Sequence, residues 1–172
     1  MGKLLVLLGA IAGIASFFLP LLHWEHKDPK VKLSVSGFKY VAGVSATRDL
    51  FETDATLSPE QEKQLLDDAN EGLTKARGGV YMIYAPVALL ILIALFSMVA
   101  GLGRGKGILA LLAGGAALLF WSVLNSALKE KGDGLLSAGL GMTLILAVAG
   151  GGILGGLVAL VKPDRKAAPP AA

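Results

Sequence analysis

The chain has 172 residues, of which 54% are hydrophobic and only 17% are charged, whereas soluble domains carry about 25% charged residues. The deficit comes from four long apolar runs, which excludes a soluble globular enzyme, a disordered protein and a coiled coil. The chain contains no cysteine, which excludes disulfides, thiolate metal sites and a cysteine nucleophile. The formal net charge is +3.

Four uncharged runs are each close to the ~20 residues that cross a bilayer as a helix. They contain no acidic, basic or histidine side chain and cover residues 4–22, 80–102, 108–128 and 135–161. The first run could instead be a secretory signal peptide, since it follows Lys3. Its one Ala-x-Ala pattern begins at Ala10, inside the apolar run, so we favour a retained signal anchor.

Basic residues near the ends of the spans predict the orientation of a membrane protein. With the N-terminus inside, the inner segments hold six basic residues against the acid Asp164, whereas residues 23–79 hold eight basic and ten acidic ones. We therefore expect both termini in the cytoplasm and residues 23–79 outside it. The Ala-, Gly- and Leu-rich composition suggests a bacterial inner (plasma) membrane, and residues 162–172 are expected to form a disordered cytoplasmic tail.

The extracytoplasmic segment begins with a strand pattern. Residues 31–36 alternate apolar and polar side chains, which is the period of a half-buried strand. Gly37 interrupts the alternation and residues 38–41 resume it. Ser36-Gly37 is therefore either the two-residue turn of a hairpin, which we favour, or a bulge in one strand.

The same segment ends with a predicted helix over residues 60–77. Ser58 suits the N-cap, Pro59 suits the first helical position, and Gln61 completes the spacing of a capping box. Gly78-Gly79 would then allow a bend into the second span. One face of the helix carries an apolar stripe that either docks on the chain itself or faces a partner, formed by Leu65, Leu66, Ala69 and Leu73.

These patterns predict a mainly α protein. We expect a polytopic four-helix transmembrane bundle with a small extracytoplasmic β-hairpin and an amphipathic helix between spans one and two, forming a single membrane domain over residues 1–161. Helices in lipid associate through small residues and polar contacts. The glycines that predict close packing within the bundle, or alternatively a homo-oligomer seam, are Gly9, Gly13, Gly114, Gly151, Gly152, Gly155 and Gly156.

Candidate metal ligands occur only where the first span ends. His23 and His26, with Glu25 and Asp28 nearby, are side chains that could bind zinc or copper. The spacing is loose, and the alternative is a polar stretch at the membrane surface that Trp24 anchors. We favour this alternative.

The third span carries an intramembrane polar patch. Ser122, Asn125 and Ser126 share one helical face, because they are three and four residues apart. They predict interhelical hydrogen bonds or, as the alternative, the lining of a pore.

No motif of a protease, a hydrolase or a nucleotide-binding enzyme occurs, and the spans lack the charges that mark pumps and transporters. We therefore expect no enzymatic activity, no cofactor and no nucleic-acid partner. The sequence favours an accessory or scaffold subunit that presents its extracytoplasmic segment to another membrane or periplasmic protein. The alternative is a homo-oligomeric channel or facilitator for a small solute or ion.

Two features carry a resemblance. The first span ends in Leu19-Pro20, and the outer loop contains Ser36-Gly37-Phe38. With three closely spaced spans following, the layout resembles small uncharacterised bacterial four-span membrane proteins. In outline it is also similar to the claudin-type tetraspan plan, which implies both ends inside and a large first outer loop with β content. The Trp-Gly-Leu-Trp motif and cysteine pair of that family are absent, so no functional residue carries over.

Overall fold

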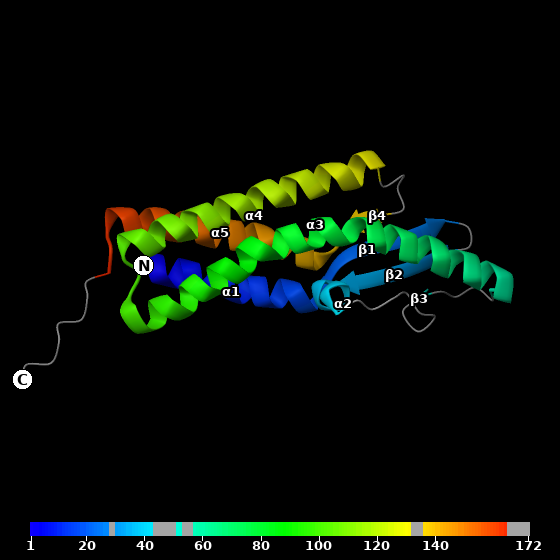
Figure 1. Ribbon diagram of the computed structural model, residues 1–172, viewed down its shortest axis with the longest axis horizontal. Coiled ribbons are helices and arrows are strands. Elements are labelled where there is room, and N and C mark those ends of the chain that lie inside the picture. Colours follow the sequence, from blue (N-terminus) through cyan, green and yellow to red (C-terminus); the bar gives the residue numbers. More distant parts are fainter. Residues whose placement is uncertain (28–29, 43–50, 53–56, 132–135, 165–172) are drawn as a thin grey trace, which may run out of the picture. The chain divides into compact units, whose positions relative to one another are not determined.

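A computed structural model describes residues 1–27, 30–42, 51–52, 57–131 and 136–164. The chain divides into two compact units. The helical unit comprises Met1–Ile14, Tyr84–Leu119 and Leu144–Ala172, and the sheet unit comprises Ala15–Ile83 and Phe120–Thr143. The elements in chain order are α1 (Gly2–Phe18), β1 (Pro20–Lys27), β2 (Lys30–Ser36), α2 (Gly37–Val41), β3 (Phe51–Glu52), α3 (Pro59–Ala100), α4 (Arg104–Lys131), β4 (Leu136–Ala138) and α5 (Leu140–Val161) (Figure 1).

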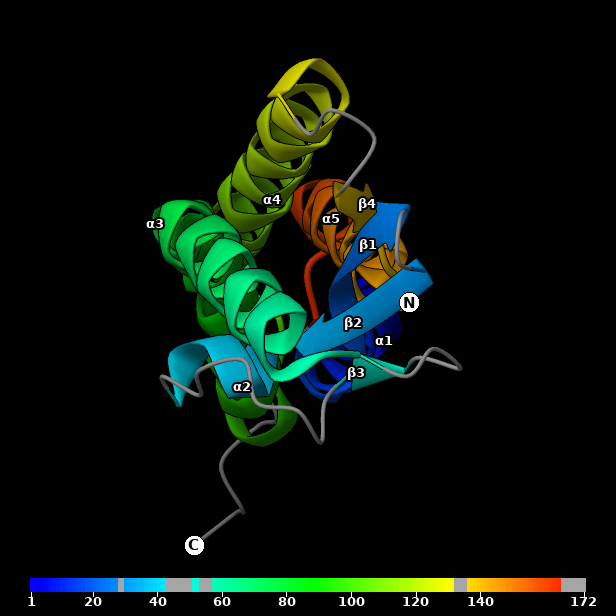
Figure 2. The ribbon, with the colours of Figure 1, turned by 90° about the vertical axis from the view of Figure 1, so that its right-hand side faces the viewer.

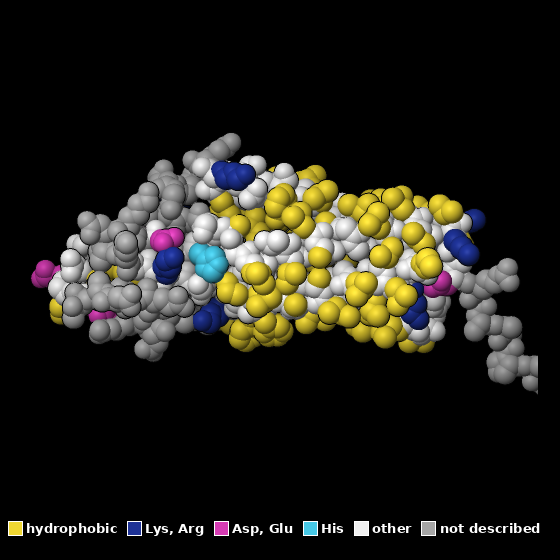
Figure 3. Space-filling view, turned by 180° about the vertical axis from the view of Figure 1, so that it is seen from behind, with side chains coloured by type: hydrophobic (Ala, Val, Ile, Leu, Met, Phe, Trp, Pro, Cys, Tyr) yellow, Lys and Arg dark blue, Asp and Glu magenta, His cyan; other side chains and the backbone are white. Residues whose placement is uncertain are grey.

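Three helices are long and apolar enough to cross a membrane, over Arg77–Ala100, Arg104–Lys129 and Leu140–Val161. The α1 helix is apolar but shorter, with 17 residues. Large apolar side chains are exposed on each of these helices (Figure 3). A helix that is apolar on its outer face as well as its inner face is stable in lipid rather than in water. The protein is therefore an integral membrane protein.

Glycines hold the helical unit together. A Cβ atom at Gly151 would lie 2.7 Å from the Cα atom of Gly9, and one at Gly152 would lie 2.8 Å from the Cα atom of Gly114. The backbones of α1 and α4 therefore each approach the backbone of α5 as closely as two helices can.

The sheet unit contains strands in the order β3-β2-β1-β4, with antiparallel pairing between all neighbours (Figure 2). Trp24 lies opposite Leu33, and Leu22 lies opposite Val35. All four side chains are buried. Because successive side chains of a strand point to opposite faces, this pairing collects the apolar residues on one face and the polar residues on the other.

The predicted hairpin was placed on the wrong residues. Its turn was expected at Ser36-Gly37, whereas the hairpin joins β1 to β2, and residues 37–41 form the short helix α2. Ser36 caps this helix, because its Oγ accepts a hydrogen bond from the backbone N–H of Lys39 at 3.4 Å. Five residues are too few to show a helical period, so the short helix resembled a continuing strand.

Two predicted spans were too long at the ends that meet the sheet. The first helix ends at Phe18 instead of residue 22, and the last begins at Leu140 instead of residue 135. Pro20 has no backbone N–H to continue a helix. The Gly139 N–H instead donates to the carbonyl of Leu21 at 2.8 Å. The end of the first apolar run and the start of the last one therefore lie in or beside the sheet.

The α3 helix is continuous over 42 residues, so the predicted end of the amphipathic helix at residue 77 is wrong. Its predicted start is confirmed. The Ser58 N–H donates to Gln61 Oε1 at 3.1 Å, and the Gln61 N–H donates to Ser58 Oγ at 3.3 Å. This is the reciprocal capping box that satisfies two backbone donors at a helix start.

A Gly78→Ala substitution is expected to raise the free energy of unfolding by up to about 1 kcal/mol, because a glycine inside a helix costs that much relative to alanine. Gly78 is exposed, and a Cβ atom there would meet nothing within 4 Å. Chemical denaturation in detergent, followed by circular dichroism, measures the change. Gly79→Ala is the matched control, with a smaller gain, because its Cβ atom would lie 3.3 Å from Leu124 Cδ1. A loss of stability in Gly78→Ala would contradict a helical conformation at this position.

Candidate functional site

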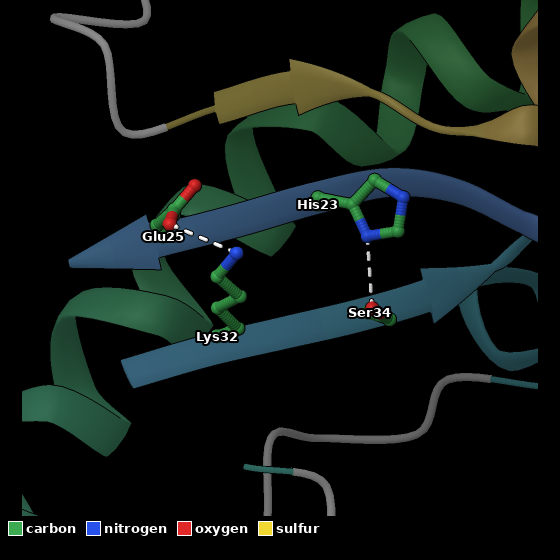
Figure 4. A network of polar contacts seen from close by, with 4 residues as sticks. All are labelled: His23, Glu25, Lys32 and Ser34. Atoms are coloured by element: carbon green, nitrogen blue, oxygen red, sulfur yellow. Dashed lines mark hydrogen bonds and ion pairs between the residues drawn. The ribbon is translucent and has the colours of Figure 1, made fainter. Parts of the chain in front are cut away.

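The outer face of the sheet carries an ordered row of polar side chains, which we call the polar sheet face: His23 and Glu25 on β1, with Lys32 and Ser34 on β2. His23 lies directly opposite Ser34, and Glu25 lies directly opposite Lys32. The Nδ1 atom of His23 lies 2.8 Å from the Oγ atom of Ser34, and Lys32 Nζ lies 3.2 Å from Glu25 Oε1 (Figure 4).

The alternation of residue types in both strands places these four side chains together. The burial of Trp24 and Leu33 on the apolar face sets the register. A shift of one residue would bring His23 and Lys32 into the core, which makes the register strongly specified. The polar sheet face is therefore built on two paired strands and not on a loop.

Glu25 and Lys32 are exposed, with side-chain exposures of 49% and 62%. An exposed ion pair of this kind contributes little to stability. Both charges and the His23 ring are accessible for hydrogen bonds to another molecule. The arrangement offers one anion, one cation and one imidazole along about three residues of strand.

The two predicted metal ligands, His23 and His26, both lie on β1, and the backbone of His26 lies opposite Val31. The side chain of His26 and all of Asp28 are outside the described residues. Within the part of the chain that the structure describes, no group of three or more His, Asp or Glu side chains could hold a metal ion. The metal site stays a prediction.

The predicted polar patch lies on α4, in the sheet unit. Ser122 and Ser126 are exposed, and Asn125 is half-buried. The two hydroxyls therefore face the surroundings of this chain. A pore lined by them would require further copies of the protein, and this role also stays a prediction.

The apolar stripe of α3 is divided. Leu65 and Ala69 are 5% and 1% exposed, so the chain itself covers them. Leu66 and Leu73 are half-buried. Only the second pair could take part in a contact with a partner.

The seven predicted packing glycines all face another helix of the same chain. A Cβ atom at Gly114 would lie 2.6 Å from Ile153 N. Gly155 would bring its Cβ atom within 2.9 Å of Gly2 O, and Gly156 within 2.6 Å of Gly107 O. The glycine faces are therefore occupied by intrachain packing, and no glycine of this set is left free for a second copy.

Basic side chains gather at one end of the helical unit, which we call the basic end. The Lys3 Nζ donates to the carbonyl of Met98 at 3.3 Å, and the Lys106 Nζ donates to the carbonyls of Phe96 and Gly101, each at 3.0 Å. The carbonyls of Phe96 and Met98 belong to the end of α3, and Gly101 directly follows the helix. Ammonium groups are favourable there, because the last carbonyls of a helix have no intrahelical partner and carry partial negative charge.

Asp164 completes the basic end, a role that sequence reasoning missed. Its Oδ2 atom accepts a hydrogen bond from the Leu102 N–H at 3.0 Å, and its own N–H donates to the Leu102 carbonyl at 3.2 Å. Gly101 makes this turn possible with φ of 68°. Asp164 is thus tied to the α3–α4 turn, and residues 165–172 of the predicted disordered tail lie outside the described residues.

Sequence reasoning also missed Gly139 and Gly141. A Cβ atom at Gly139 would collide with the carbonyl of Pro20, and one at Gly141 would lie 2.7 Å from the carbonyl of Ser16. Neither glycine has a second small residue four positions away on the same helix, which is the spacing that marked the other packing glycines. Their short separation, Gly-x-Gly at the start of an apolar run, was the only signal.

No family model, curated protein or solved structure matches the chain. The likeness to bacterial four-span proteins and to the claudin plan therefore stays a likeness of layout.

Proposed function

We propose that the protein is a non-enzymatic accessory or scaffold subunit of a membrane complex. It holds the polar sheet face at the extracytoplasmic surface of the membrane, where a partner protein binds it. The observation that carries this proposal is the exposed, charged row on a sheet whose other face is buried. Polar groups that are fixed by strand register and contribute little to stability are available for specific recognition.

Four spans are part of this proposal. In the helical unit, Gly2 lies against Gly155 and Ala159, and Gly9 lies against Gly151. In the sheet unit, Gly141 lies against Ser16. The α1 helix thus contacts α5 from near one end to near the other. Because α5 is long enough to span and the 17 residues of α1 run along most of it, these contacts support α1 as a fourth span.

The basic end supports the proposed orientation. Lys3, Arg104, Lys106 and Lys162 lie where α1 and α4 begin and where α3 and α5 end. The positive-inside rule assigns this end to the cytoplasm, with both termini there. The sheet then lies on the extracytoplasmic side of a bacterial inner membrane.

The alternative function, an oligomeric channel or facilitator, depends on the exposure of Ser122 and Ser126 on α4. The occupied glycine faces argue against the route by which copies were expected to assemble. Flux of a small solute through proteoliposomes above the background of empty vesicles would favour this alternative over the accessory role.

The proposed role predicts that Lys32→Glu lowers binding of the partner about tenfold, which corresponds to 1.4 kcal/mol. The substitution places a like charge beside Glu25 and reverses the sign presented by β2. Chemical crosslinking of the full chain in native membranes, followed by quantitative mass spectrometry, measures the yield of the crosslinked partner.

Lys75→Glu is the matched control. Lys75 is also exposed and paired, with Nζ 2.6 Å from Glu71 Oε1, but it lies on α3. Partner yield within twofold of the unmodified protein is expected for this variant. Equal yields of the crosslinked partner from the two variants would show that the polar sheet face does not bind the partner.

A further inference from the structure

Three phenylalanine rings form a compact cluster, which we call the aromatic cluster: Phe17 and Phe18 at the end of α1, and Phe38 on α2. The ring centroids of Phe17 and Phe18 are 5.5 Å apart, those of Phe17 and Phe38 6.0 Å, and those of Phe18 and Phe38 5.9 Å. Strand register brings the three rings together, because Pro20, which follows α1, lies opposite Ser36, which precedes α2. The end of α1 and the start of α2 therefore lie side by side at one end of the hairpin.

Two rings of this cluster are open to the surroundings. Phe18 is 63% exposed and Phe38 is 50% exposed. Aromatic side chains of this size strongly favour removal from water. Contiguous exposed apolar surface of this kind marks an interaction site.

The short helix α2 presents its apolar side outward. Phe38 and Val41, three residues apart and hence on one face, are both exposed, whereas Gly37 and Tyr40 are buried. Lys39, which follows Phe38 in the sequence, is half-buried. The exposed side of α2 is therefore apolar, whereas a helix at a water-exposed surface usually places its polar residues outward.

Phe18 also ends an exposed row along α1. Leu4, Leu8, Ile11 and Ile14 precede it at helical spacing, and all are exposed. Whatever covers this row covers Phe18 as well. If α1 spans the membrane, as the proposed function requires, then lipid covers the row, and the cluster is its continuation.

We infer that α2 lies in the headgroup region of the extracytoplasmic leaflet, with Phe18, Phe38 and Val41 in contact with lipid. Aromatic rings concentrate at this depth, and the Lys39 stem can reach along the apolar surface while its ammonium group meets phosphate. The aromatic cluster thereby sets the depth at which the chain leaves the bilayer and enters the sheet. This inference rests on the proposed four-span arrangement.

The test uses nitroxide labels, because the chain has no cysteine and each label site needs a single substitution. Val41→Cys labels the exposed face of α2 and leaves the three rings in place. Leu8→Cys labels the exposed row of α1, and Lys32→Cys labels the polar sheet face. The full-length protein is reconstituted in vesicles of phosphatidylethanolamine and phosphatidylglycerol, and collision of each label with oxygen and with a water-soluble nickel chelate is measured.

The expected ratio of oxygen to nickel collisions is highest at position 8, lowest at position 32 and intermediate at position 41. A high ratio at position 8 with an aqueous ratio at position 41 would overturn the inference and leave the four-span arrangement intact. A low ratio at position 8 would overturn the arrangement itself. Broadening between labels at position 41 that disappears on dilution with unlabelled protein would identify a second copy, instead of lipid, as the occupant.

Discussion

A Gly114→Leu substitution is expected to prevent folding of the helical unit. A Cβ atom at this position would lie 2.6 Å from Ile153 N and 2.7 Å from Ala149 O. Both are backbone atoms of α5, so no side-chain rotation relieves the collision, and the two helices have to separate. Overpacking costs about 3 kcal/mol or more where the structure cannot adjust, and helices in lipid depend on this close approach. Thermal unfolding in detergent, followed by circular dichroism, measures the loss.

Gly115→Leu provides the matched control on the same helix. Gly115 is exposed, and a Cβ atom there would meet nothing within 4 Å. The leucine would project from the unit and leave the unfolding temperature nearly unchanged. If Gly114→Leu folds as well as Gly115→Leu while only the size of the assembly changes, the seam serves association between copies, and the intrachain contact is not essential.

A Gly139→Val substitution is expected to detach the sheet from the helix ends. The Cβ atom would collide with the Pro20 carbonyl and lie 3.1 Å from the Leu21 carbonyl carbon. The strand β4 could then no longer pair with β1, and the hydrogen bond from Gly139 N–H to the Leu21 carbonyl would be lost. Trp24 is buried on β1, so its fluorescence emission is expected to shift to longer wavelength.

The measurement uses a Trp121→Phe background, which leaves Trp24 as the one fluorescent tryptophan. Gly72→Val serves as the control, because a Cβ atom at Gly72 would meet nothing within 4 Å. It lies on α3, in the same unit. An unchanged emission maximum in Gly139→Val, matching that of Gly72→Val, would show that the junction tolerates a side chain.

Local patterns in the sequence determined most of the helical framework. The absence of charge over residues 80–102, 108–128 and 135–161 sufficed to predict three helices long enough to span, and Ser58, Pro59 and Gln61 sufficed to predict the start of α3. Caps and apolar length depend on residues within a few positions of one another, so sequence alone contains their physical cause. The alternation in residues 31–36 likewise identified β2.

Tertiary structure decided where the apolar runs change from helix to strand. Leu21 and Leu22 suit either state, and only pairing with β2 and with β4, more than 100 residues away, makes them a strand. The sequence also could not predict which helix each glycine contacts. Gly114 and Gly115 are neighbours in the chain, but only Gly114 faces α5. The same holds for the polar sheet face and the aromatic cluster. Both arise from strand register, which is a relation between distant residues, whereas the sequence by itself determined the local elements that the register brings together.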